Sequence, residues 1–83
     1  MMGISGLKVT LRNRSNVVIQ TAAVNVLYYD ANNKLLERKM VYFSNIPARG
    51  KLTLPAPDHK WADHVEFKLS AVSAKQDRYA MNK

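Results

Sequence analysis

Apolar and polar side chains alternate along several short stretches of the chain, and the densest run of strand-forming residues spans residues 24–30. On one face of a strand this run places Val24, Val26 and Tyr28. Leu27 and Tyr29 fall on the opposite face. Large side chains on both faces are typical of a central strand, so we expect this strand to lie inside a sheet and to be covered on both sides.

Further strand patterns surround this central run. They span residues 7–12, 17–23, 34–43, 51–54 and 65–71. The passage from Val17 to Asp30 is long for one straight strand, so we expect a bend or bulge near residues 20–22 to split it. The mixed pattern of residues 34–43 suits a strand near a sheet edge, with a short helix over residues 35–40 as the alternative.

Turn-forming residues separate the strands. Asp30-Ala31-Asn32-Asn33 predicts a hairpin loop in which Asp30 caps its own turn and Asn33 adopts a left-handed conformation. Residues 44–50 form a crossing loop, because Pro47 and Gly50 interrupt regular pairing. A polar connection at residues 58–63 contains the only tryptophan.

Short strands separated by such turns predict an all-β chain that forms an antiparallel immunoglobulin-like β-sandwich of five to seven short strands. Residues 1–83 make a single domain, with a patterned core at about residues 7–73 and a tail or weak edge strand at residues 74–83. The apolar parity of the strands predicts a core of Leu7, Val9, Leu11, Val24, Val26, Tyr28, Leu52, Leu54, Val65, Phe67 and Leu69.

The composition of the chain limits its possible cross-links, metal sites and cellular compartments. The chain has no cysteine, which excludes disulfides and Cys-based zinc sites. We identify no signal peptide in residues 1–6 and no apolar run long enough to cross a membrane. The chain is therefore either cytoplasmic or one module of a longer exported protein, and the early start of the strand pattern at Leu7 favours the second.

The central strand and its turn resemble a known family. Val26-Leu27-Tyr28-Tyr29-Asp30, the polar turn after it and the crossing from Ile46-Pro47 to Gly50 resemble the FxLYD family of bacterial and archaeal immunoglobulin-like modules. The likeness spans roughly residues 7–72, with Val26 where Phe is typical and Tyr28 where Leu is typical. It implies a module of an envelope or exported protein, and it supplies no catalytic residues.

The charge balance suggests one candidate binding face. Thirteen basic and six acidic residues give a formal charge of +7. If the first strand pairs with the strand at residues 51–54, one exposed face carries Lys8, Arg12, Arg14 and Lys51, together with Thr53. Such a face suits phosphates or acidic glycans, although scattered charge also serves solubility. Because exposed aromatic side chains do not alternate with these basic residues, we expect no strong nucleic-acid binding.

The two Asp-His pairs are the other chemical candidates. Asp58-His59 and Asp63-His64 have the right ligand types for a metal ion, but a flexible loop and a missing third ligand lead us to expect no metal. Between them, Trp61 is a candidate loop anchor for a partner, or else it folds over the open end of the core, which we favour.

No serine lies in a nucleophile elbow and no glycine-rich phosphate loop is present, so we expect neither an enzyme nor a cofactor. The first functional hypothesis is a non-catalytic structural or binding module of a larger bacterial envelope or exported protein. Its partners are proteins or other domains of the same polypeptide, with an anionic ligand as a further option. The alternative is a small basic OB-like nucleic-acid-binding barrel acting in the cytoplasm.

Overall fold

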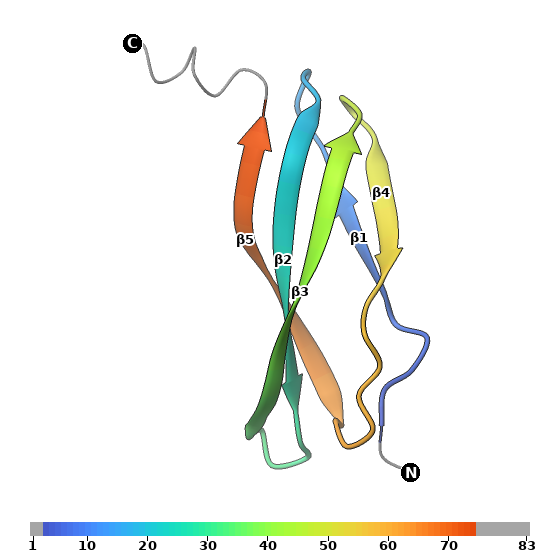
Figure 1. Cartoon of the computed structure of the whole chain (residues 1–83), viewed down its shortest axis with the longest axis vertical. Coiled ribbons are helices and arrows are strands. Elements are labelled where there is room, and N and C mark those ends of the chain that lie inside the picture. The colour runs from blue at the N-terminus through green and yellow to red at the C-terminus, as the bar shows by residue number, and fades with distance from the viewer. Residues whose placement is uncertain (1–2, 75–83) are drawn as a thin grey trace.

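The computed structural model describes residues 3–74, which form an antiparallel β-sandwich of five strands in two sheets (Figure 1). The strands are β1 (Lys8–Arg12), β2 (Ile19–Tyr29), β3 (Leu35–Ile46), β4 (Lys51–Pro55) and β5 (His64–Ala74). One sheet has the order β3-β2-β5 and the other pairs β1 with β4. The predicted all-β sandwich is confirmed. Among residues 3–74 there is no helix, and so none that could span a membrane.

Strand β2 is the central strand, as expected. It pairs with β3 on one side and with β5 on the other, and its inward residues Val26 and Tyr28 are completely buried. The strand runs unbroken from Ile19, so the expected division into two strands is wrong. A shift in the pairing with β5 does occur between Ile19 and Thr21, close to the expected bend.

The second sheet forms as the sequence predicts. Strand β1 pairs antiparallel with β4, which brings Val9 opposite Leu54 on the core face. On the outer face the hydroxyls of Thr10 and Thr53 lie 2.7 Å apart and share a hydrogen bond. In the upper half of Figure 1, β4 lies at the right and β5 at the left, with β1 behind β3; below the middle the sheet twists and β5 crosses to the right of β2 and β3.

The hairpin between β2 and β3 is confirmed in detail. The Asp30 carboxylate accepts hydrogen bonds from the backbone N–H of Asn32 at 2.8 Å and of Lys34 at 2.9 Å. Asn33 has a φ of 65°, the left-handed conformation expected from its side chain. The return strand begins at Leu35 and extends to Ile46, three residues beyond the prediction, and it is an edge strand of its sheet.

A buried asparagine ties the two sheets together where the chain crosses between them. Asn13 is 2% exposed, and its Nδ2 lies within hydrogen-bond distance of the carbonyl oxygens of Val17, Ile46 and Pro47, at 2.7–3.1 Å. Its Oδ1 accepts bonds from the N–H and the hydroxyl of Ser15. The sequence suggested only a turn here, because a buried role for Asn13 depends on three carbonyls that lie elsewhere in the chain.

The predicted core is correct except for two residues of β5. Nine of its eleven members are buried or pack against the buried cluster. The prediction that Phe67 and Leu69 lie in the core is wrong, because they are 44% and 57% exposed. Their strand parity is right, since they pair with the buried Val26 and Val24, but the two-stranded second sheet does not extend over them. Leu27 is 6% exposed although it lies on the outer face, and Tyr29 beside it is half-buried.

The ends of the described chain add one further contact. Ile4 forms a short bridge with His59, with backbone bonds of 2.7 and 2.9 Å, so ordered pairing begins before Leu7. The predicted tail or edge strand at residues 74–83 lies outside the described residues, apart from Ala74, which ends β5.

Candidate functional site

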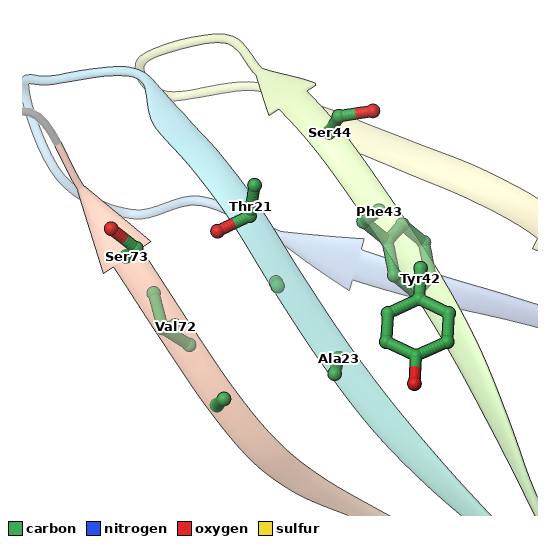
Figure 2. A pocket seen from close by; sticks show the side chains of 9 residues that line it. Thr21, Ala23, Tyr42, Phe43, Ser44, Val72 and Ser73 are labelled. Carbon is green, nitrogen blue, oxygen red and sulfur yellow. The ribbon is translucent and has the colours of Figure 1, made fainter.

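The outer face of the β3-β2-β5 sheet contains a hollow of about 420 Å³ (Figure 2). It is lined by Thr21, Ala22, Ala23, Tyr42, Phe43, Ser44, Ala71, Val72 and Ser73. The register creates it, because Ala23 pairs with Ala71 and Thr21 pairs with Ser73 on the same face. Small side chains side by side on adjacent strands leave a depression that larger residues would fill.

Tyr42 stands at the edge of this hollow. It lies opposite Ala23 in the ladder between β2 and β3, and 70% of its surface is exposed. Figure 2 shows its ring standing clear of the ribbon on the same side as Thr21, Ser44 and Ser73. We call the lining residues that lie on the outer face, Thr21, Ala23, Tyr42, Ser44, Ala71 and Ser73, the outer-face site. The pattern of a single strand does not predict the hollow, because the hollow depends on the register of three strands.

The opposite end of the outer face carries a polar cluster. The rings of Tyr29 and His64 stack with centroids 5.4 Å apart, and the Tyr29 hydroxyl donates to Glu66 Oε1 at 3.1 Å. Loss of solvation raises the pKa of the Tyr29 hydroxyl, and the hydrogen bond and charge of Glu66 raise it further, while Arg38 opposes the shift. Tyr29 therefore remains a neutral donor at neutral pH. His64 Nδ1 lies 2.9 Å from Asp63 Oδ2.

A second cluster, around His59, holds the connection between β4 and β5 against the core face. The His59 ring stacks on Tyr28 at 5.2 Å, and its Nδ1 accepts a bond from the N–H of Trp61 at 3.1 Å. Nε2 is then the donor to Glu37 Oε1, 3.2 Å away. The Tyr28 hydroxyl donates to the carbonyl of Pro57. Burial raises the pKa of Tyr28, with smaller contributions from Glu37 and Asp58.

The two histidines do not share a site. They stack on successive tyrosines of β2, whose side chains point to opposite faces, so the imidazoles lie on opposite sides of the sheet. Asp58 Oδ1 accepts a bond from the backbone N–H of Gly6 at 3.3 Å, so this carboxylate binds a backbone amide. Within residues 3–74 no three His, Cys, Asp or Glu side chains are grouped to hold a metal ion.

The candidate basic face is brought together in part. Arg12 lies opposite Lys51, and Lys8 is at the other end of β1, on the same outer face as Thr53. Arg14 follows the strand in the adjoining loop. There its carbonyl accepts a bond from Arg49 Nη1 at 2.9 Å, while Arg49 Nε donates to Asn16 at 2.9 Å. Arg49 was missed, because only the fold brings residues 14 and 49 together.

Trp61 does not fold over the core. It is 67% exposed, and the adjacent Ala62 is fully buried in its place. The expectation of a covering tryptophan is therefore wrong. Its backbone N–H bond to His59 fixes the loop, while the indole remains exposed as the candidate anchor.

No family model, no curated protein and no solved structure matches this chain. The likeness to the FxLYD family thus stays a prediction from the residues quoted for it.

Proposed function

We propose that this chain is a non-catalytic immunoglobulin-like binding module that docks a protein surface onto its outer-face site. The observation that carries the proposal is Tyr42, 70% exposed beside a hollow lined by small residues. Tyrosine is among the residues that most often dominate binding energy at protein interfaces, and a neighbouring depression can receive a side chain of the partner. The partner is another protein or another domain of the same polypeptide.

The chemistry of the hollow favours an apolar protein contact. None of its nine lining residues is charged, although the whole chain has a formal charge of +7. Its floor belongs to β2, which is held by ladders on both sides. A preformed surface loses little conformational freedom on binding, which favours affinity from a small contact area.

The proposed setting is a larger bacterial envelope or exported protein. This part of the proposal rests on the resemblance of residues 26–30 and of the crossing from Ile46 to Gly50 to the FxLYD family. Sequencing the reading frame on both sides of this stretch tests it. A signal peptide and further domains are the expected result, and a frame without either contradicts it.

The OB-like alternative has less support from the arrangement of charges and rings. An OB-fold is a partly closed barrel, whereas the strands here form two separate sheets. Lys8, Arg12 and Lys51 lie on the β1–β4 layer, and Tyr42 lies on the outer face of the other sheet. Single-strand binders instead combine a basic groove with stacking aromatic rings on one surface.

Site-specific photo-cross-linking in living cells of the source organism tests the docking proposal. The variant Tyr42→p-benzoyl-phenylalanine should give a protein cross-link that survives nuclease treatment. The matched control is the same replacement at Thr53, exposed on the other layer, which should give none. Adding Thr21→Leu, which fills the hollow, should reduce the product. Equal products from positions 42 and 53, or a product that nuclease removes, would contradict the proposal.

A further inference from the structure

The two sheets are closed along one long side of the sandwich and open along the other. On the closed side β3 contacts β4, and the short crossing at residues 47–50 joins them. On the open side the outermost strands are β1 and β5, and no contact of similar extent joins them. In Figure 1 the upper half of β5 lies to the left of the β1–β4 layer.

The open side exposes side chains that belong to the core face. Phe67, Leu69 and Val72 are 44%, 57% and 44% exposed. The ladder pairs them with Val26, Val24 and Ala22, all of which are buried on that face. Directly paired residues of an antiparallel ladder share a face, so these three apolar side chains point between the sheets and lack a cover.

Strand β1 supplies the matching backbone edge. Among residues 3–74 it pairs with β4 alone, which leaves its other edge free for a further strand. Packed sheets lie roughly 10 Å apart and β1 lies behind β3, so a strand added to its free edge lies behind β2, next to the inner side of β5 (Figure 1). Every second side chain of that strand would then contact Phe67, Leu69 or Val72, as in β-strand addition.

The charges on β1 define the other side chains of the added strand. Lys8, Thr10 and Arg12 all point outward, where residues of a neighbouring strand lie directly beside them. Opposite charges on adjacent strands stabilise a sheet, and like charges destabilise it. The open side therefore favours an extended segment whose apolar residues alternate with acidic ones.

The same charges disfavour two other occupants. Residues 75–83 contain three basic residues and one acidic residue, so as a strand beside Lys8 and Arg12 they would place like charges next to one another. A second copy of the chain, with its formal charge of +7, meets the same repulsion.

We propose that the open side binds an extended segment of a partner protein, with alternating apolar and acidic residues, as an additional strand on β1 that covers Phe67, Leu69 and Val72. This inference goes beyond the outer-face site, because it uses the other face of the β3-β2-β5 sheet and a different edge.

The test is an NMR titration of the isotope-labelled full chain with a capped peptide of roughly eight residues, about one strand in length, that alternates Val and Glu. Saturable shifts are expected at the backbone amides of β1 and at the side chains of Phe67, Leu69 and Val72. A peptide alternating Val and Lys should bind at least tenfold more weakly. A block peptide of the same Val and Glu composition should also bind at least tenfold more weakly.

Two variants and one control locate the site. Leu69→Ser and Arg12→Glu should each weaken the binding of the Val–Glu peptide to the chain at least tenfold. Leu35→Ser should leave binding unchanged, since Leu35 is similarly exposed, at 42%, but lies on β3 near the hairpin. Because Leu69 is more than half exposed, its replacement should leave the chain folded, and the amide spectrum checks this.

Several results overturn the proposal. Equal binding of the three peptides, or no binding of any, rejects a strand site with this charge preference. Nuclear Overhauser effects between residues 75–83 and the Phe67 ring in the free chain would show that its own segment covers the face. A dimer in sedimentation equilibrium that Leu69→Ser abolishes would show a second copy there. Cross-linking through position 42 should be unaffected by Leu69→Ser, so the two proposals can fail independently.

Discussion

Phe43 and Phe67 make the difference between the two sides of the sandwich clear. Both lie on strands that flank β2, and both point from the β3-β2-β5 sheet toward the second sheet. Phe43, on the closed side, is 2% exposed, whereas Phe67, on the open side, is 44% exposed. Strand parity decides which face a side chain takes, but the number of strands in the opposite sheet decides whether that face is covered.

The closed side also has buried and partly buried polar contacts. Asn13 bonds there to the carbonyls of Ile46 and Pro47, where the chain leaves β3 for β4. Stability should therefore be concentrated on the closed side, and the open side should tolerate substitution. Two predictions test this difference, and two more test the hairpin and the basic face; all four run from the largest expected effect to the smallest.

Replacing the two phenylalanines gives the largest expected contrast. Phe43→Ala should lower the free energy of unfolding by about 3–5 kcal/mol, because it leaves a cavity in a packed core. Phe67→Ala should lower it by about 1 kcal/mol, because nearly half of the side chain is already exposed. Urea denaturation measures both values. Equal losses would mean that the two sides are packed alike, and Phe43→Leu replaces Phe43→Ala if that variant does not fold.

Asn13→Ala should lower the free energy of unfolding by about 2 kcal/mol, because it removes the donor to buried carbonyls and leaves them without a partner. Asn16→Ala is the matched control: its side chain bonds to Arg49 at an exposed position, so its loss should be small. The same urea titration compares them. A mild effect of Asn13→Ala would show that water forms hydrogen bonds to these carbonyl oxygens as well as the side chain does.

The hairpin at Asn33 should respond more weakly. Asn33→Val should destabilise the chain by about 1–2 kcal/mol, since a β-branched residue resists a φ of 65°. Asn33→Gly should be neutral or slightly stabilising, because glycine adopts this conformation without strain. Thermal melts of both variants provide the measurement. Stabilisation by valine would contradict the left-handed conformation.

Nucleic-acid binding by the basic face should be the smallest effect. A few phosphate contacts from Lys8, Arg12, Arg14 and Lys51 release few counterions, so binding should be detectable at low salt and largely lost at about 150 mM. Fluorescence anisotropy with single-stranded and duplex oligonucleotides across a salt series measures it. Submicromolar affinity that persists at physiological salt and falls on charge reversal of Arg12 and Lys51 would instead support the OB-like function.

Local patterns predicted much of this fold. The alternation of Leu7, Val9 and Leu11 placed β1, and Asp30 with Asn33 defined the hairpin, because each depends on residues that are neighbours in sequence. The basic face followed from one correct pairing, of β1 with β4.

The remaining features depend on contacts between distant segments. The exposure of Phe67 reflects a missing neighbour in the other sheet, and no property of its own strand reveals this. The hollow beside Tyr42 needs Ala23 and Ala71 in register. His59 meets Glu37 because the ladder places Glu37 opposite Tyr28, the ring on which His59 stacks.

The arrangement of the first and last strands has a mechanical consequence. Strands β1 and β5 run in the same direction, and the described chain enters at the end of the molecule where β5 begins, whereas β5 ends at the other end (Figure 1). Gly3 and Ala74 therefore lie toward opposite ends of the long axis. Tension applied between them acts along the strands, while the ladder hydrogen bonds lie across them. Such a pull shears the β1–β4 and β2–β5 ladders as whole units instead of opening them one bond at a time.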